Sequence, residues 1–390
     1  MQNFIFENST RIIFGKGTIA RIGDEVKRFG TNVLLVYGQG SIKKHGIYDQ
    51  VISSLTKANL SIVEFPGVKT NPVLSHARTG IELARSQKIN VILAVGGGSV
   101  IDEAKVIAAG VEADPGVDVW DFFTITKKIR KAVPILTVLT VSASASEMNS
   151  TAVITKEEGA QKYAITSRLI SPKTSVLDPT VLFSLTAERT AYSAVDVITH
   201  LLEHYFNNPD PESPLQDRLI EGIMKTVMES TEAILKDPQD YSARANMMWS
   251  ATLAFNGLTA AGMGSIILPV HLIEHSLSAM YDIAHGAGLS VIFPGWMKYA
   301  LDKKLLKFAQ LGRAIFNVRT TDDRKAALEG IKRLKRWFSS IGSPTSLKEA
   351  GIPESDIDRI AENSAALAKL WEWNDYTREV IVEVLRLCKE

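Results

Sequence analysis

The chain has 390 residues, of which 45% are hydrophobic, and it carries 44 Lys plus Arg against 43 Asp plus Glu. This length exceeds the size at which one hydrophobic core usually keeps growing, so we expect two domains. A formal net charge of +1 offers no electrostatic attraction for nucleic acid or for an anionic membrane surface, which favours a small-molecule ligand.

The N-terminal residues NFIFENSTRIIFGKGTI alternate apolar and polar side chains, which predicts two short strands joined by a turn near Asn8 and Ser9. An isolated hairpin is barely stable in water, so this one needs a partner, either its own domain or a second subunit. The same residues do not resemble a signal peptide. The one cysteine, Cys388, excludes an internal disulfide and a thiolate metal cluster. We therefore expect a cytoplasmic protein.

From residue 32 the chain alternates predicted strands and helices. Short apolar runs rich in Val, Ile and Leu occupy residues 32–38, 60–65, 90–97 and 133–140, and helical stretches such as residues 73–88 separate them. Regular alternation predicts right-handed crossovers and an open parallel sheet, in which ligands bind beyond the carboxyl ends of the strands. A last strand-like run lies near residue 175, before a capped helix that begins after Thr186.

After residue 185 the pattern is helical throughout. We therefore predict an α/β domain at residues 1–185 and an all-helical domain at residues 186–390. Pro209, Pro211 and Pro214 indicate a loop before a long helix over residues 217–235. Residues 251–270 carry no charge, but their glycines and polar side chains favour a buried helix over a membrane span.

Three of the seven histidines lie between Pro269 and Gly286. If this stretch is helical, His271 and His275 share one face. Asp196 and His200 are likewise four residues apart, beside the apolar stripe of the helix after Thr186. A buried carboxylate is costly without a cation, and a carboxylate with several imidazoles suits a first-row metal. Taken one at a time, each histidine also fits a structural role, and that role is our interpretation of His45, His76 and His204.

The spacing D-x3-H followed by H-x3-H-x9-HG, within DVITHLLE and HLIEHSLSAMYDIAHGAGLSVIFP, resembles the iron-containing (group III) alcohol dehydrogenases, in their butanol dehydrogenase and aldehyde reductase branch. The resemblance implies one divalent metal, Fe²⁺ or Zn²⁺ with Mn²⁺ or Co²⁺ as alternatives, on four ligands: Asp196, His200, His271 and His285. It also implies that His275 is a non-ligand histidine beside the substrate, which we expect to relay the proton.

The run GGGSVIDEAK, at residues 96–105, follows a predicted strand and opens a helix, so its backbone can approach a phosphate. It is not a GxGxxG fingerprint, but GGGSxxDxxK resembles the pyrophosphate motif of the same family. The resemblance implies cofactor contacts from the glycine run and from the segments that follow, at Gly96, Gly97, Gly98, Ser99, Asp102, Thr137, Thr140, Ser144 and Lys162.

The turn YGQGS after the first long strand contains Gly38, Gln39, Gly40 and Ser41. An acid here would bind a ribose 2′-OH and repel a 2′-phosphate, and the turn has none. Gly38 and Gly40 leave room, Ser41 can donate a hydrogen bond, and two lysines follow. We therefore predict NADP(H) rather than NAD(H).

Together these features predict hydride transfer between NADP(H) and a primary alcohol or aldehyde. One alternative is a relative of dehydroquinate synthase or glycerol dehydrogenase that acts on a polyol. A phosphorylated polyhydroxy acid would need several basic residues near the metal, and the stretches 189–206 and 265–290 contain only Arg189. A non-catalytic metal or nucleotide sensor is a third possibility. By the same resemblance, we expect a homodimer formed through residues 1–17.

Overall fold

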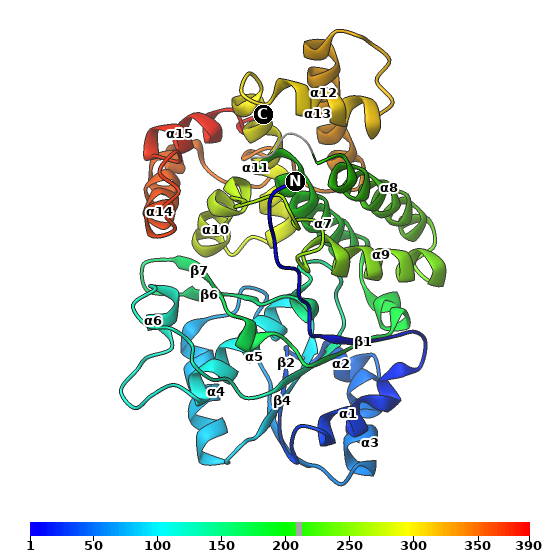
Figure 1. Ribbon diagram of the computed structural model, residues 1–390, viewed down its shortest axis with the longest axis vertical. Coiled ribbons are helices and arrows are strands. Elements are labelled where there is room, and N and C mark those ends of the chain that lie inside the picture. The colour runs from blue at the N-terminus through cyan, green and yellow to red at the C-terminus, as the bar shows by residue number, and fades with distance from the viewer. Residues whose placement is uncertain (208–212) are drawn as a thin grey trace. The chain divides into compact units, whose positions relative to one another are not determined.

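The computed structural model describes residues 1–207 and 213–390, which form two compact units (Figure 1). The α/β unit comprises Glu7–Leu185 with Gln239–Thr252, and the helical unit comprises Met1–Phe6, Thr186–Pro238 and Leu253–Glu390. The predicted fold class is confirmed. A single division at residue 185 does not describe the units, because residues 1–6 and 239–252 each belong with the other half of the chain.

A six-stranded parallel sheet forms the centre of the α/β unit. Its order is β1-β8-β5-β4-β2-β3, and its strands are Arg11–Phe14 (β1), Asn32–Tyr37 (β2), Ser61–Phe65 (β3), Val91–Gly96 (β4), Ile135–Leu139 (β5) and Thr174–Leu177 (β8). Every residue of β4 and β5 is buried, as central strands covered on both faces require.

Helices cover both faces of this sheet. They are α1 to α6, at Ile22–Lys27, Ser41–Lys44, Ile47–Lys57, Leu74–Ser86, Gly98–Val111 and Trp120–Phe123. The step from β2 to β3 runs in one direction along the sheet, and the steps from β3 to β4 and from β4 to β5 run in the other. Right-handed crossovers therefore place α3 on one face and α4 and α5 on the opposite face. The connections after β2 and after β4 therefore leave in opposite directions across the sheet. Ligands of such sheets bind at this switch point, outside the carboxyl ends of the two strands.

A second sheet in this unit was not predicted. The antiparallel strands β6 (Thr151–Lys156) and β7 (Gln161–Thr166) form a hairpin that packs on α5 through β6. Lys162, one of the predicted cofactor residues, lies on β7.

The predicted N-terminal hairpin is wrong. Only β1 forms, and it pairs in parallel with β8 of its own sheet. Asn8 interrupts the extended chain because its side-chain oxygen accepts a hydrogen bond from Thr10 N, 3.2 Å away, while its amide donates to Met148 O. Within the helical unit, Gln2 N donates to Gly262 O at 2.8 Å, which binds the first residues to a loop instead of a strand.

The helical unit contains α7, α8 and α10 to α15, at Ala187–Asn207, Pro214–Lys236, Pro269–Tyr281, His285–Ala300, Leu305–Ala314, Asp323–Ser340, Ile357–Leu370 and Arg378–Arg386. An aromatic cluster of Phe206, Phe293, Trp296 and Phe308 lies in its core. Pro214 opens α8 as its first residue. The rest of the predicted proline loop, at Pro209 and Pro211, lies outside the described residues.

The buried helix predicted over residues 251–270 is also wrong in most of its length. Helix α9 spans Tyr241–Ala254, and residues 255–268 are irregular. Gly257, Gly262 and Gly264 have φ angles of 95°, 74° and 80°, a left-handed conformation that a helix cannot contain. Among the described residues, no helix is both long and apolar enough to span a membrane.

Residues 239–252 belong with the sheet because α9 contacts it through side chains. The ring of Trp249 lies 6.2 Å from that of Phe14 in β1, edge to face. Thr252 Oγ1 donates to the buried carboxylate of Glu147 at 2.6 Å. These contacts depend on spatial neighbours that the periodicity of the helix does not reveal.

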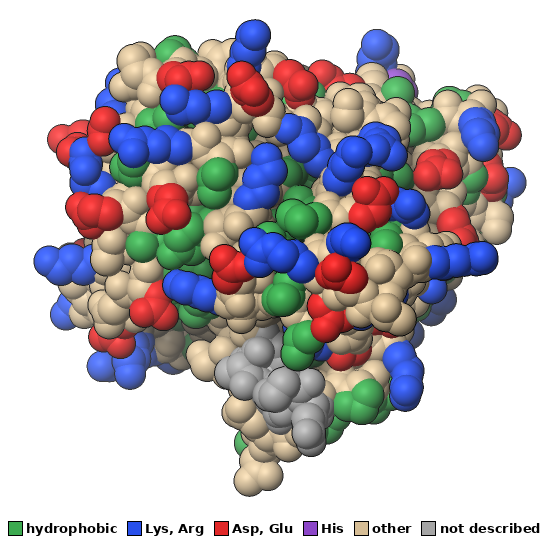
Figure 2. Space-filling view, turned by 90° about the horizontal axis from the view of Figure 1, so that it is seen from above, with side chains coloured by type: hydrophobic (Ala, Val, Ile, Leu, Met, Phe, Trp, Pro, Cys, Tyr) green, Lys and Arg blue, Asp and Glu red, His purple; other side chains and the backbone are tan. Residues whose placement is uncertain are grey.

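Acidic and basic side chains are interspersed over the face shown in Figure 2, which carries no block of one sign.

Candidate functional site

Helix α7 aligns three buried polar side chains in the helical unit. Its start is set by Thr186, whose Oγ1 accepts a hydrogen bond from Arg189 N at 3.2 Å, as an N-cap does. Asp196, His200 and Glu203 then follow at spacings of four and three residues, so they share one face of the helix. Their side chains are 6%, 6% and 0% exposed, beside the apolar stripe that packs into the core.

Helix α10 and the turn after it contribute the remaining histidines. Pro269 occupies the first helical position, where its missing N–H costs nothing, and His271 and His275 follow on one face. The helix ends at Asp282, whose φ of 51° is left-handed, and α11 begins at His285. This break between His275 and His285 returns the chain toward α7, so that His285 Nε2 lies 3.8 Å from Asp196 Oδ1.

Three of the predicted ligands, all histidines, converge on a carboxylate oxygen of the fourth, Asp196. Asp196 Oδ1 lies 3.3 Å from His200 Nδ1, 3.7 Å from His271 Nε2 and 3.8 Å from His285 Nε2. Asp196, His200 and His271 form a buried group with metal-binding geometry. Ligands held about 2.1 Å from a shared tetrahedral ion lie about 3.4 Å from one another, so these separations fit a divalent cation.

Several polar atoms of this cluster have no hydrogen-bond partner, and a bound cation would satisfy them instead. Asp196 Oδ1, His200 Nδ1 and His271 Nε2 are all buried, and none has a hydrogen-bond partner. Buried polar atoms without partners are rare and costly. Three such atoms facing one another fit a metal ion, because each can donate a lone pair to it.

Electrostatics in the cluster favours an ionised carboxylate. Burial alone would raise the pKa of Asp196, but the neighbouring imidazoles of His200, His271 and His285 outweigh burial and lower that pKa below its usual range. Burial lowers the pKa of His200 well below its ordinary value, so this imidazole is neutral and can act as a ligand. For His271, burial is outweighed by the carboxylates of Glu203 and Asp196, which raise its pKa to about 10, so a metal ion that binds Nε2 must displace a proton from this ring.

Two functional residues escaped the sequence reasoning. Glu203 accepts a hydrogen bond from His271 Nδ1, and Glu274 accepts one from His285 Nδ1. Both carboxylates are fully buried. The sequence did contain a signal for these two glutamates, because the pattern H-x2-E occurs in both α7 and α10. A glutamate inside an apolar stripe is buried, and a buried carboxylate needs a partner.

The other histidines occupy distinct environments. His275 is buried, and its ring lies 6.1 Å from that of His285 and 5.9 Å from that of Trp371. His204 is a core residue, because its Nδ1 pairs with Thr259 Oγ1 at 2.9 Å and burial lowers its pKa to about 4. His76 stacks on Phe65 in the α/β unit and is not part of the D-x3-H or H-x3-H motif. His45 is exposed.

In the α/β unit, the two predicted nucleotide turns are neighbours at the switch point of the sheet. Tyr37 and Val95 are paired in the ladder, so Gly38 to Ser41 after β2 and Gly96 to Ser99 after β4 emerge at the same edge. Gln39 lies in the first of these turns. Thr140 N donates to Gly96 O at 2.9 Å, which brings the segment after β5 to this edge as well.

Packing against the chain itself explains the glycine run at residues 96–98. A Cβ on Gly96 would lie 2.4 Å from Val100 Cγ2, one on Gly97 would lie 2.9 Å from Val141 Cβ, and one on Gly98 would lie 2.3 Å from Ser144 Oγ. Ser99 Oγ donates to Thr70 O. The segment that contains the predicted residues Thr140 and Ser144 therefore presses directly on the start of α5.

Polar groups deeper in this motif bind one another. The carboxylate of Asp102 accepts from Ser146 Oγ at 2.5 Å and from Val153 N at 3.0 Å, and burial raises its pKa. Lys105 is fully buried, and its Nζ has four oxygen partners at 2.7 to 3.1 Å, namely Ser146 Oγ, Asn149 O and Oδ1, and Thr151 O. Thr137 is fully buried within β5. Lys162 donates to Asn71 Oδ1 at 3.2 Å.

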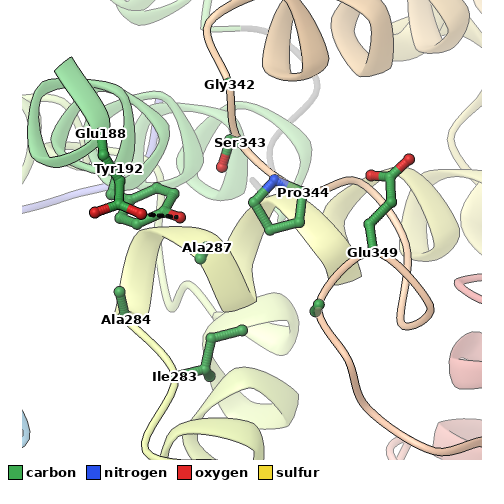
Figure 3. A pocket seen from close by; sticks show the side chains of 10 residues that line it. Glu188, Tyr192, Ile283, Ala284, Ala287, Gly342, Ser343, Pro344 and Glu349 are labelled. Atoms are coloured by element: carbon green, nitrogen blue, oxygen red, sulfur yellow. Dashed lines mark hydrogen bonds between the residues drawn. The ribbon is translucent and has the colours of Figure 1, made fainter.

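A cavity of about 610 Å³ lies in the helical unit beside the start of α11 (Figure 3). Ile283, Ala284 and Ala287 form one wall, and Glu188 and Tyr192 of α7 line another. Ala284 immediately precedes His285, but none of the four predicted metal ligands lines the cavity. The cavity is therefore not the metal centre.

The sheet edge that suits a dinucleotide and the buried cluster that suits a divalent cation are the two kinds of site that a metal-dependent dehydrogenase needs. Residues 9–179 match the family model of the iron-containing alcohol dehydrogenases, and residues 190–388 match that of the C-terminal region of the Fe-containing alcohol dehydrogenase family. The chain belongs to the iron-containing alcohol dehydrogenase family.

Its relatives agree over nearly the whole length. The chain is 39% identical to the probable NADH-dependent butanol dehydrogenase 1 of Bacillus subtilis, over 99% of each chain. It is 35% identical to the NADPH-dependent aldehyde reductase YqhD of Escherichia coli, over 97% of this chain and 98% of that one. The crystal structure of NADH-dependent butanol dehydrogenase A from Thermotoga maritima matches with a TM-score of 0.95 and 45% identity, covering 100% of this chain and 99% of that chain.

Proposed function

We propose that this chain transfers hydride between a nicotinamide cofactor and a primary alcohol or aldehyde, with one divalent metal held by Asp196, His200, His271 and His285. The observation that carries the proposal is the set of three buried atoms without hydrogen-bond partners, Asp196 Oδ1, His200 Nδ1 and His271 Nε2. Relatives named as butanol dehydrogenases and as an aldehyde reductase support the substrate class.

When bound, the metal supplies a Lewis acid for a carbonyl oxygen. The protein's own residues do the rest. Asp196 contributes the negative charge that offsets the cation, and the neutral His200 imidazole leaves a nitrogen lone pair available. His275 follows His271 by one helical turn, and we propose that a ring nitrogen of His275 delivers the proton to the alkoxide oxygen, directly or through water.

The polyol alternative gains no support from the residues around the cluster. A phosphorylated or polyhydroxylated acid needs basic side chains near the metal. Arg189, the one basic residue in the stretches 189–206 and 265–290, is exposed in the first turn of α7. We therefore propose an uncharged, short-chain alcohol or aldehyde as the substrate.

The test is reconstitution of the metal-free protein with Fe²⁺, Zn²⁺, Mn²⁺ or Co²⁺, followed by a screen of aldehydes and alcohols against NADPH and NADH. We expect metal-dependent oxidation of the reduced cofactor by short aldehydes. Chelator-treated protein without added metal is the control, and it should be inactive. Equal turnover with and without metal, or no turnover with any substrate, would contradict the proposal.

We further propose that NADP(H) is preferred. The turn Gly38 to Ser41 has no carboxylate, and a Cβ added to Gly38 would lie 3.6 Å from Val68 O, so the turn has room. Lys43 lies 3.4 Å from Glu64, a carboxylate that also accepts from the hydroxyls of two tyrosines, so the charge of Lys43 is already offset. The preference therefore rests on the absent acid and on Ser41. Relatives differ here, since the butanol dehydrogenases are named NADH-dependent and the reductase NADPH-dependent.

Gly38→Asp tests this preference, because aspartate fits the site and would repel a 2′-phosphate. We expect the ratio of kcat/KM for NADPH over NADH to fall by about tenfold to a hundredfold, which corresponds to roughly 1–3 kcal/mol. A parent enzyme that already prefers NADH would show the assignment to be wrong. So would a ratio that the substitution leaves unchanged.

We also propose a homodimer formed through residues 1–17. Phe4, Ile5 and Phe6 are 52%, 84% and 46% exposed, a run of three apolar side chains that water solvates poorly. Strand β1 is an edge strand with an unpaired side. Light scattering should give a dimer for the parent and a monomer for Ile5→Asp. Leu306→Asp, at another exposed apolar residue (71%), is the matched control and should remain dimeric.

A further inference from the structure

Two buried glutamates link the three helices that carry the candidate metal ligands. Glu203 of α7 contacts His271 of α10, and Glu274 of α10 contacts His285 at the start of α11. Each glutamate thus belongs to one helix and holds a histidine of the next. Both side chains are 0% exposed, so neither carboxylate is solvated by water. Burying a charge this deeply is costly unless its partners are well placed.

The carboxylate of Glu203 uses both of its oxygens. Oε1 accepts the N–H of Val270 at 2.6 Å, and Oε2 accepts the Nδ1–H of His271. Val270 is the second residue of α10, so its N–H is one of the groups that the helix leaves without an internal partner. Glu203 therefore fixes both the backbone at the start of α10 and the orientation of the His271 ring.

Glu274 has a matching arrangement around its own two oxygens. Oε2 accepts the Nδ1–H of His285, and Oε1 accepts the hydroxyl of Ser278, one turn later in α10. Space for this carboxylate depends on Gly288 in α11, where an added Cβ would lie 2.8 Å from Glu274 Cγ and Oε1. Glu274 thereby holds the His285 ring across the left-handed turn at Asp282.

These contacts determine which nitrogen each ring presents to the cluster. Because Nδ1 of His271 and of His285 carries the hydrogen that binds a glutamate, the neutral form of each ring has its lone pair on Nε2, the nitrogen that faces Asp196 Oδ1. His200 differs. Its Nδ1 faces Asp196, and its ring lies between those of Phe255 and His271, at 4.3 and 4.4 Å.

We propose that Glu203 and Glu274 are positioning residues that hold His271 and His285 in the Nδ1–H form, aim their Nε2 atoms at one point, and so set the affinity of the site for a divalent metal. The proposal rests on the metal-dependent function proposed above. In metal sites of other proteins, a carboxylate behind a ligand histidine fixes its tautomer and increases its basicity. The same residues would otherwise only cross-link helices, and the two roles give different results.

The experiment measures Co²⁺ and Zn²⁺ binding to the metal-free full-length protein by competition with a chromophoric chelator, together with the Co²⁺ absorption spectrum. Glu203→Gln and Glu274→Gln keep the side-chain shape and one acceptor oxygen but remove the charge. We expect each to weaken metal binding by about tenfold to a hundredfold and to alter the Co²⁺ spectrum. Thermal unfolding of the same metal-free variants should change much less than metal affinity does.

Glu188→Gln is the matched control, because Glu188 lies on α7 as well, is exposed, and contacts Tyr192 instead of a histidine. It should bind metal as the parent does. Glutamine variants with the parent's affinity and spectrum would overturn the inference and leave the proposed function standing. A parent protein that takes up no Co²⁺ would overturn the proposed function itself, and the inference with it.

Ser278→Ala keeps the proposal testable if either glutamine variant does not fold. It removes only the hydroxyl that donates to Glu274 and changes neither a ligand nor a carboxylate. Losing one hydrogen bond to a charged group should weaken metal binding by about threefold to tenfold. An affinity equal to the parent's, with an unchanged Co²⁺ spectrum, would remove Glu274 from the positioning role.

Discussion

Two buried polar clusters, one in each unit of this protein, are satisfied in different ways. In the helical unit, Asp196 Oδ1, His200 Nδ1 and His271 Nε2 face one another without hydrogen-bond partners. In the α/β unit, Lys105 Nζ has four oxygen partners, and both oxygens of Asp102 accept hydrogen bonds from the chain. The first cluster has lone pairs and charge that a cation would satisfy, whereas the second is satisfied by the chain itself.

The presence or absence of hydrogen-bond partners distinguishes residues that bind a ligand from residues that hold the fold in place, although both kinds occur in polar sequence motifs. Residues that bind something absent from the chain leave buried atoms unpaired, because the fold supplies no partner for them. Residues that hold a loop in place are paired within the chain. This criterion favours our proposal that the D-x3-H and H-x3-H motifs hold a metal, and it favours a structural role for the aspartate and lysine of GGGSxxDxxK over the start of α5.

The largest effect should come from a ligand in the unpaired cluster. We expect His200→Gln to weaken divalent metal binding by about a hundredfold to a thousandfold, because a total of about 10–16 kcal/mol is shared among four ligands in such sites. Activity should fall to the level of metal-free protein. Cofactor binding should survive, since every predicted cofactor residue lies in the other unit. Metal analysis and cofactor titration of the purified variant check both expectations.

His204→Gln is the matched control for this prediction. His204 lies one turn further along the same helix, but it pairs with Thr259 in the core. It should keep its metal. If His204→Gln loses metal as completely as His200→Gln does, the distinction between unpaired and satisfied histidines fails.

The next effect concerns the completed network in the α/β unit. Lys105→Met keeps the length of the side chain but leaves oxygens of Ser146, Asn149 and Thr151 without their donor. Asn149 Oδ1 still accepts from Thr151 N and Ser146 Oγ still donates to Asp102, so the carbonyl oxygens of Asn149 and Thr151 lose most. At about 1–3 kcal/mol for each unsatisfied group, we expect the free energy of unfolding to fall by about 2–6 kcal/mol. Urea unfolding followed by circular dichroism measures this change, and metal affinity should stay the same.

Lys44→Met provides the comparison, because Lys44 is exposed at the end of α2. Surface substitutions of this kind usually stay within about 0.5 kcal/mol. A Lys105→Met protein as stable as the Lys44→Met protein would show that the buried lysine is not a support.

Sequence patterns predicted the buried sheet well and its irregular surroundings poorly. The strands β2 to β5 follow from short runs rich in Val, Ile and Leu, and the helix after Thr186 follows from its cap. The β6–β7 hairpin was not predicted, and the predicted N-terminal hairpin does not form. Their outcome depends on contacts with α5 and with the loop at Gly262, which lie far away in the sequence.

The site shows the same limit. Spacing and resemblance predicted the four residues that converge on one oxygen, because helical geometry brings side chains four residues apart to one face. Spacing alone could not show that Glu203 reaches α10 or that Glu274 reaches α11, since both contacts join different helices. Nor could it show that His204, with the same spacing from His200, turns toward Thr259 instead.

The smallest effect tests why the glycine run is there. Either Gly98 allows a phosphate to approach, or it makes room for Ser144, whose Oγ would lie 2.3 Å from an added Cβ. We expect Gly98→Ala to lower the stability of the cofactor-free protein by about 1–3 kcal/mol, the usual cost of overpacking. Adding Ser144→Ala should restore part of this loss, because the nearest remaining atom, Ser144 Cβ, would lie 3.2 Å away. Gly222→Ala is the control, since nothing lies within 4 Å of its Cβ position on α8, and it should gain about 0.4–1 kcal/mol. Denaturant unfolding without cofactor decides between the two reasons: a stable Gly98→Ala protein that binds cofactor poorly would assign the glycine to the phosphate, and the α/β motif would then be a ligand site of the same kind as the histidine cluster.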